Sequence, residues 1–206
     1  MDNNTLTLKT YNKIAENFSY THHDPIFWKD EFDYFRNRLS GKKVIDIGCG
    51  AGRDAVLFVR YHFDYLGIDG SKGMLAVAKK RVPKGKFKVM DYFKMKFPNK
   101  TFDGFWAVAA LLHLPKSEVK IVLKSIHKIA KDDAVGFISM KKKKHLDEGI
   151  VEETKFGGIK RYFAFYTKKD FSQVLIDSGF KIIKSYEKPE GDDFGTIWLC
   201  YFIKKA

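Results

Sequence analysis

A glycine-rich turn that follows an apolar stretch contains the residue types in this chain most suited to chemistry. Residues 44–53 read VIDIGCGAGR, so β-branched residues lead directly into three closely spaced glycines. Glycines in such a turn let the backbone approach a ligand closely. A second apolar stretch, 65–68, ends in Asp69, about 20 residues after the glycines, where doubly wound nucleotide-binding sheets place a ribose-binding carboxylate. The pattern predicts an adenosine-containing cofactor at the carboxyl ends of two neighbouring strands.

Two charged residues distinguish this turn from a dinucleotide-binding turn. The dinucleotide pattern G-x-G-x-x-G leaves the turn neutral, so that pyrophosphate can lie at a helix N-terminus. Here the third glycine position of that pattern is Arg53, and Asp46 stands just before the turn. A carboxylate at this place repels a pyrophosphate and suits a cationic ligand. S-adenosylmethionine, which carries a sulfonium and an ammonium group, is such a ligand, and a nicotinamide reductase is disfavoured.

Three later motifs extend the comparison to a known family. They are KVMDY at 88–92, TFDGFW at 101–106 and LLHLP at 111–115. With the glycine turn and Asp69, they resemble the class I S-adenosylmethionine-dependent methyltransferases over roughly residues 40–140. The resemblance implies S-adenosylmethionine as the cofactor and an acid, Asp91, that holds the adenine amine. The cofactor-binding residues that it implies are Asp46, Ile47, Gly48, Cys49, Gly50, Gly52, Asp69, Gly70, Met74, Asp91, Tyr92, Tyr11 and Ala107.

Apolar periodicity divides most of the chain into alternating strands and helices. The predicted helices are 6–20, 26–39, 54–61, 72–81, 116–130 and 168–178, and the predicted strands are 43–47, 63–68, 87–90, 104–108, 134–140, 180–186 and 196–203. The alternation predicts an α/β fold, a doubly wound Rossmann-like sheet of seven mostly parallel strands with helices on both faces. No helix separates the last two strands, which predicts an antiparallel last strand.

The length of 206 residues predicts a single methyltransferase domain, 1–206, with four parts. We expect N-terminal lid helices at 1–40, a cofactor-binding core at 41–140, an inserted loop or hairpin at 141–167, and a C-terminal helix and strand pair at 168–206. The insertion begins with four lysines, 141–144, which indicate a solvated loop or, alternatively, a phosphate-binding segment.

Residues that could bind substrate lie mainly outside the core motifs. Methyl transfer needs alignment more than covalent help, so no catalytic triad is expected. His113 is the candidate general base, because histidine titrates near neutral pH, and it could equally be a helix-start residue. Tyr11 begins a Tyr-x-x-Ile-Ala pattern that resembles the lid helix of small-molecule members; packing in the core is the alternative. The predicted substrate-binding residues are Phe18, Tyr20, Trp28, Trp106, Arg161 (as an anion clamp) and Tyr166.

Composition limits the kinds of binding partner and cellular setting that fit the chain, but it does not identify a partner. The formal net charge is +13, and lysine supplies most of the basic residues, which fits an anionic partner, a hot environment or genome composition. No long apolar run is present, so no membrane span is expected. Two isolated cysteines, Cys49 and Cys200, give no disulfide framework and fit a reducing, cytoplasmic setting. The adjacent His22 and His23 point apart on most backbones, so no metal is expected.

Three functions remain open from the sequence. The leading one is a methyltransferase that transfers the sulfonium methyl in line to an O, N or S (or metalloid) nucleophile of a small molecule. The segment from Arg161 to Phe180 resembles a branch often labelled as general or tellurite-type methyltransferases. The alternatives are an RNA or tRNA methyltransferase, which the positive charge favours, and a non-catalytic S-adenosylmethionine-binding protein. Either a monomer or a homodimer is compatible with these functions.

Overall fold

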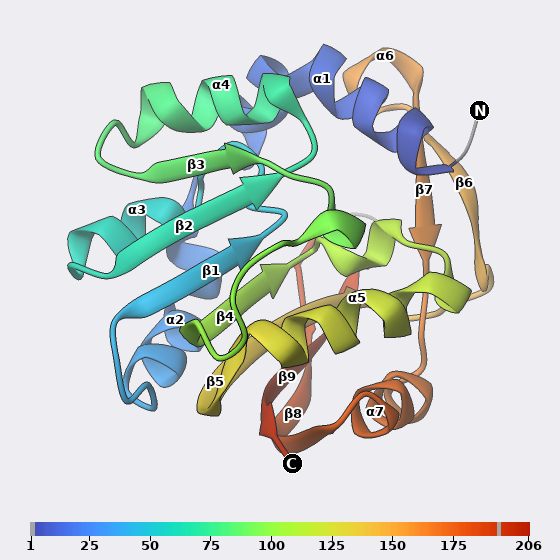
Figure 1. Cartoon of the computed structure of the whole chain (residues 1–206). Coiled ribbons are helices and arrows are strands. Elements are labelled where there is room, and N and C mark those ends of the chain that lie inside the picture. Colours follow the sequence, from blue (N-terminus) through green and yellow to red (C-terminus); the bar gives the residue numbers. More distant parts are fainter. Residues whose placement is uncertain (1–2, 193–194) are drawn as a thin grey trace.

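Seven strands form one sheet in the order β3-β2-β1-β4-β5-β9-β8 in the computed structural model, which describes residues 3–192 and 195–206 (Figure 1). The strands are β1 (Lys43–Ile47), β2 (Asp64–Asp69), β3 (Lys86–Val89), β4 (Phe102–Val108), β5 (Ala130–Lys141), β8 (Phe180–Pro189) and β9 (Ile197–Lys205). The first five are parallel, whereas β9 lies antiparallel between β5 and β8. The predicted α/β sheet with an antiparallel last strand is confirmed.

Helices cover both faces of this sheet. They are α1 (Asn3–Thr21), α2 (Lys29–Arg36), α3 (Ala55–Arg60), α4 (Lys72–Arg81), α5 (Lys116–Ile129), α6 (Lys155–Gly158) and α7 (Lys168–Asp177), with short 3-10 turns η1 (Pro25–Trp28), η2 (Tyr92–Lys94) and η3 (Leu111–His113). In Figure 1, α5 lies in front of the sheet, α2 and α3 lie behind it, and α1 runs beside α4 at the top. The N-terminal segment therefore covers the edge where the parallel strands end.

Local sequence explains where the principal elements begin. Ser71 caps α4 by accepting a hydrogen bond from the Met74 N–H, and Thr167 caps α7 in the same way from Asp170. All seven residues of β4 are buried, which fits a central parallel strand covered on both faces. Because β1, β2 and β4 are parallel neighbours, their carboxyl ends lie on one side of the molecule.

A second, two-stranded sheet lies outside the main one. β6 (Glu148–Glu153) pairs antiparallel with β7 (Ile159–Ala164), and Figure 1 shows this hairpin beside α1. This hairpin lies within 141–167, which was expected to be an inserted loop or hairpin, and its first strand begins before residue 155. The lysine run is divided, because Lys141 is the last residue of β5 and only the following lysines lie in the connecting segment. Among the described residues, no helix is both long and apolar enough to cross a membrane.

Candidate active site

The glycine turn follows β1 with a backbone that ordinary residues rarely adopt. Gly48 has φ +72°, and its N–H donates to the Ile68 carbonyl at 2.8 Å, which ties the turn to the end of β2. A Cβ at Gly48 would lie 2.5 Å from the Ala110 Cβ and 2.7 Å from the Tyr92 hydroxyl oxygen. Glycine is thus required here both by the backbone conformation and by the space. The turn brings backbone groups close to whatever binds at the ends of β1, β2 and β4.

Asp69 is fixed against this turn at the end of β2. Its carboxylate accepts hydrogen bonds from the Gly50 N–H at 2.9 Å and the Ser71 N–H at 2.8 Å. Burial raises the pKa of this carboxyl, and the two N–H donors oppose that rise. Each oxygen accepts one of these bonds, so acceptor capacity remains for a diol. The residue therefore has the position and the chemistry expected of a ribose-binding acid.

Asp46 lies one strand away but is turned into the core. It is 3% exposed and accepts a hydrogen bond from the Tyr65 hydroxyl at 2.8 Å. Burial, and next the nearby Asp54 carboxylate, raise the pKa of Asp46 well above its ordinary value. Asp54 itself is paired with Arg53 at 2.6 Å. The direct partners of Asp46 are thus core groups, and a contact with the cationic end of a cofactor stays a prediction.

Helix α1 is attached to the start of α4 next to this site. The Asn12 side-chain oxygen accepts hydrogen bonds from the Ser71 hydroxyl at 2.9 Å and the Gly73 N–H at 2.8 Å. An apolar cluster lies between the two helices, made of Ala15, Ala51, Met74 and Val77 with Tyr11 and Phe18 packed against it. Ala51 belongs to the glycine turn, so α1 covers that turn directly.

A buried chain of hydrogen bonds connects α1, η3 and β7. The Tyr11 hydroxyl lies 2.8 Å from His113 Nε2, and His113 Nδ1 lies 2.7 Å from the Tyr162 carbonyl oxygen. A carbonyl only accepts, so Nδ1 carries the proton and Nε2 accepts from the tyrosine hydroxyl. Arg161 Nη1 donates to the same hydroxyl at 2.5 Å, and its Nε donates to the Glu153 carboxylate at 2.8 Å. We call Glu153, Arg161, Tyr11 and His113 the buried hydrogen-bond chain.

This arrangement does not support His113 as a general base. Burial, and next the positive charge of Arg161, lower the pKa of His113 to about 3. A group with so low a pKa accepts a proton poorly near neutral pH, and its free nitrogen is already bonded to Tyr11. In this structure His113 Nε2 instead accepts a hydrogen bond from the Tyr11 hydroxyl.

Arg161 was expected to bind an anion, and the structure changes that expectation. Its guanidinium is buried, paired with Glu153 and bonded to Tyr11, so its charge is compensated within the protein. A compensated guanidinium has little attraction left for a substrate anion. The direct partners of Arg161 are thus Tyr11 and Glu153, and its contact with a substrate anion stays a prediction.

The other predicted substrate residues fall into two groups. Phe18 lies beside the buried hydrogen-bond chain, with its ring 5.4 Å from that of Tyr11. Trp28 and Trp106 are core residues with 1% and 0% exposure, because both belong to the aromatic cluster under α2 and α3. Tyr20 is 83% exposed, and Tyr166 packs against Phe171 of α7. Trp28 and Trp106 are too buried for the predicted substrate contacts, whereas those of Tyr20 and Tyr166 stay predictions.

The remaining predicted cofactor residues surround the glycine turn or end β4. Asp91 caps η2 by accepting from the Phe93 N–H at 3.0 Å, and Tyr92 follows it over Gly48. The sequence did not indicate Asn12, which bonds α1 to the start of α4, or Glu153, which pairs with Arg161. The buried residues among the predicted cofactor set are Asp46, Ile47, Cys49, Gly52, Asp69, Met74 and Ala107.

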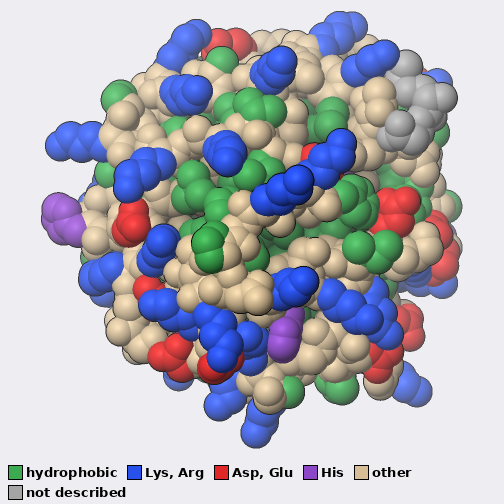
Figure 2. All heavy atoms as spheres, in the orientation of Figure 1, with side chains coloured by type: hydrophobic (Ala, Val, Ile, Leu, Met, Phe, Trp, Pro, Cys, Tyr) green, Lys and Arg blue, Asp and Glu red, His purple; other side chains and the backbone are tan. Residues whose placement is uncertain are grey.

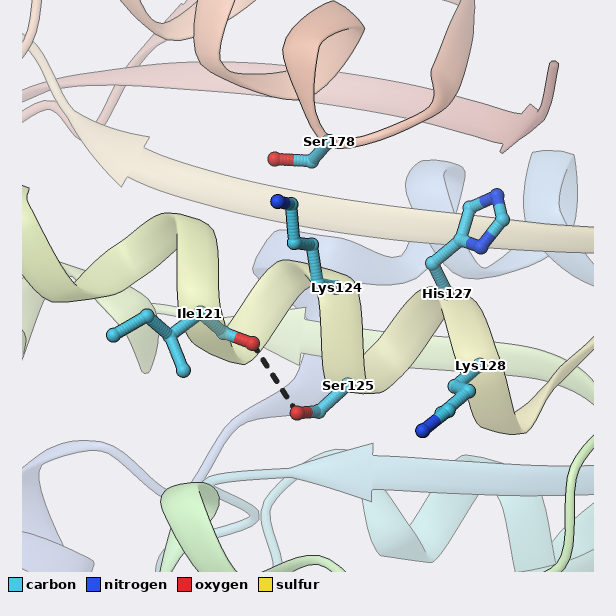
Figure 3. Close-up of a pocket in the computed structure, with 6 residues that line it drawn as sticks. All are labelled: Ile121, Lys124, Ser125, His127, Lys128 and Ser178. Atoms are coloured by element: carbon cyan, nitrogen blue, oxygen red, sulfur yellow. Dashed lines mark hydrogen bonds between the residues drawn. The ribbon is translucent and has the colours of Figure 1, made fainter.

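Two surface hollows of the described structure lie elsewhere. The first, about 440 Å³, lies between α5 and the end of α7 and is lined by Ile121, Lys124, Ser125, His127, Lys128 and Ser178 (Figure 3). The second, about 330 Å³, lies near the start of β2 and β3. Neither is lined by the glycine turn or by the buried hydrogen-bond chain, so we assign the candidate site from its side chains.

Comparison with known proteins shows what the central part of the chain is similar to. A family model described as a methyltransferase domain matches residues 44–133. The sterol 24-C-methyltransferase of Gibberella zeae is 38% identical over 96 residues, which are 41% of this chain and 25% of that protein. The tRNA (carboxymethyluridine(34)-5-O)-methyltransferase of Saccharomyces cerevisiae is 31% identical over 113 residues, 55% of this chain and 39% of that protein. The chain thus spans less than half the length of either relative.

A solved structure extends the fold comparison to nearly the whole chain. The 1,6-didemethyltoxoflavin-N1-methyltransferase of Burkholderia thailandensis, with bound S-adenosylhomocysteine, aligns with a TM-score of 0.79 at 16% identity. The alignment covers 98% of this chain and 88% of that one. Residues 44–133 therefore match a methyltransferase domain, and the fold of the chain is similar to that of this solved methyltransferase. S-adenosylmethionine is the cofactor of this family.

Proposed function

We propose that this chain is an S-adenosylmethionine-dependent methyltransferase whose acceptor is a small molecule. The observation that carries the proposal is the cover over the carboxyl ends of β1, β2 and β4. Helix α1 and the β6–β7 hairpin are joined there by the bond from Arg161 to Tyr11 at 2.5 Å. Such a cover favours a compact acceptor, which can be enclosed, and disfavours a macromolecular acceptor.

The residues of the site have separate tasks in this proposal. Asp69 holds the ribose diol, and the glycine turn accepts the rest of the cofactor against its backbone. S-adenosylmethionine, when bound, supplies an electrophilic methyl group on its sulfonium. The chain aligns the acceptor, and closure by α1 excludes water. The same proposal assigns 1–40 to the lid, 41–140 to the cofactor, 141–167 to substrate enclosure and 168–206 to the end of the sheet.

A tRNA acceptor is the second candidate, because one specific observation favours it. The relative from Saccharomyces cerevisiae is a tRNA methyltransferase, and this chain carries a formal net charge of +13. Figure 2 shows Lys and Arg side chains spread over one face, with acidic and apolar side chains between them. A dispersed distribution indicates a solvated surface more than one continuous track for a phosphate backbone.

The experiment uses methyl-labelled S-adenosylmethionine with a cell extract separated into RNA and low-molecular-weight fractions. Label among the small molecules is the expected result, and label in RNA would replace the proposal with the second candidate. Tight cofactor binding with no label in either fraction would indicate a non-catalytic binding protein.

An Asp69→Ala variant tests the cofactor site in the same assay. It should lose cofactor affinity at least about tenfold, because hydrogen bonds to a charged group contribute about 1.5–3 kcal/mol. The matched control is Asp64→Ala, at the exposed start of the same strand, where the carboxylate pairs with Lys86 on the surface. Unchanged affinity in Asp69→Ala would refute the assignment of the ribose site.

A further inference from the structure

Lys141 differs from the lysines that follow it in the sequence. It is the last residue of β5, it is only partly exposed, and its amine lies 4.9 Å from the Phe163 ring centroid and 5.8 Å from that of Trp198. In the part of the chain that the structure describes, no carboxylate lies within ion-pair distance of this amine. By contrast, Lys142 pairs with Glu187 at 2.7 Å. Lys141 is thus a cation among aromatic rings, at the edge of the sheet where the strands end.

Trp198 supplies a second, independent observation. It stands opposite Lys141 in the pairing of β5 with β9, so both side chains lie on the same face of the sheet. Its indole is 6% exposed, and Nε1 has no hydrogen-bond partner among the described residues. A buried donor without an acceptor is costly, and most buried donors are bonded. Here an N–H donor without an acceptor lies beside an ammonium group without a carboxylate.

Phe163 places this pair of donors next to the candidate active site. Its ring is 4.8 Å from the His113 ring and 5.1 Å from the Arg161 guanidinium carbon, while its ring centroid is 4.9 Å from the Lys141 amine. Phe163 therefore separates the buried hydrogen-bond chain from the two donors by one ring. A molecule bound at Lys141 would lie beside the lid and the end of β4.

The surrounding charges leave the Lys141 amine available for a ligand. Arg161 is paired with Glu153, and its positive charge also acts on the Lys141 amine. Burial lowers the pKa of Lys141, and the more distant carboxylates Glu153, Glu190 and Asp192 partly offset this effect. An anion bound beside the amine would compensate the desolvated charge directly.

We infer that the Lys141 amine and the Trp198 indole N–H bind a negatively charged group of the acceptor, so that the substrate is an anionic small molecule. The inference rests on the proposed function and deepens it by naming the charge class of the acceptor. A carboxylate and a phosphate both fit an ammonium group and an N–H donor. The aromatic rings of Phe163 and Trp198 would line the site around that group.

The test divides the low-molecular-weight fraction by anion exchange before the methylation assay. The retained pool contains anions, and the unretained pool contains neutral and cationic molecules. The wild-type protein should label the retained pool. Lys141→Gln should reduce that labelling at least about tenfold at limiting substrate, because it removes a charge-assisted bond. Trp198→Phe, which keeps the ring and removes the N–H, should reduce it by a smaller factor.

Lys142→Gln is the matched control, since it makes the same charge change at the next residue of the chain, where the amine already has a partner. Both site variants should bind S-adenosylhomocysteine as the wild type does, measured by calorimetry. Label confined to the unretained pool, or equal labelling by Lys141→Gln and wild type, overturns the inference and leaves the proposed function standing. Label in neither pool refutes the proposed function, and the inference fails with it.

Discussion

Removing the hydroxyl of Tyr11 should destabilise the protein far more than the loss of one oxygen atom suggests. In Tyr11→Phe, His113 Nε2 loses its donor and Arg161 Nη1 loses its acceptor, and both groups stay buried. Each buried polar group left without a partner costs about 1–3 kcal/mol, and more when it is charged. We therefore expect the free energy of unfolding to fall by about 3 kcal/mol.

Urea unfolding followed by circular dichroism measures this change, and a thermal scan provides a second measure. For a domain of this size, a loss of about 3 kcal/mol corresponds to a melting temperature about 6–12 °C lower. Tyr20→Phe is the matched control, because it makes the same chemical change on the same helix at a side chain that is 83% exposed. That variant should stay within about 0.5 kcal/mol of the wild type.

The outcome for Tyr11→Phe separates two views of the buried hydrogen-bond chain. If its free energy of unfolding matches that of Tyr20→Phe, the bonds from Arg161 and His113 to Tyr11 do not hold the lid in solution. The contacts of α1 with the β6–β7 hairpin would then depend on other bonds, such as those of Thr7 and Thr10 with β7.

Three further predictions concern the same region. Glu153→Gln should lower the free energy of unfolding, measured in urea, by about 3–5 kcal/mol, because it leaves the buried Arg161 charge uncompensated. The control Glu152→Gln, at an exposed neighbouring residue, should change this free energy little. His113→Gln should make stability less sensitive to acid. The folded-state pKa of His113 is about 3, so the unfolded state of the wild type binds a proton before the folded state does as pH falls from about 6.5 toward 3. The free energy of unfolding of the wild type therefore decreases by up to about 1.4 kcal/mol per pH unit across this range. Parallel plots of unfolding free energy against pH for wild type and variant, measured in urea, would contradict this. Gly48→Ala should abolish S-adenosylhomocysteine binding in calorimetry, since the backbone at this residue has φ +72° and the new Cβ would lie 2.5 Å from the Ala110 Cβ. If the variant binds with the affinity of the wild type, the turn is not the cofactor site.

The sheet and its cofactor end could be predicted because their signals are local. The glycine turn at 44–53 and the acid at Asp69 each follow a strand directly, and parallel strands bring such ends together. The missing helix between β8 and β9 was equally visible in the sequence and gave the antiparallel pair. These features depend on spacing along the chain and not on which way a particular side chain points.

The substrate side could not be predicted in the same way, because it depends on side-chain direction and register. Trp106 lies on a strand buried on both faces, so no polar alternation shows that it points under α3. The pairing of Arg161 with Glu153 depends on a hairpin turn in which Phe156 and Gly157 have positive φ. The sequence showed two glycines there without fixing which residues face each other. Lys141 was hidden in the same way, within a run that reads as solvated.

The bond between Arg161 and Tyr11 joins residues that are 150 positions apart. Contacts of such long sequence separation require a large loop to close before they contribute anything, so they form late in folding. The glycine turn and Asp69 belong to the first third of the chain, whereas the bond from β7 to Tyr11 of α1 cannot form until β7 has been synthesised. During synthesis, the glycine turn and the end of β2 would remain without the contacts between α1 and β7 until β7 has left the ribosome.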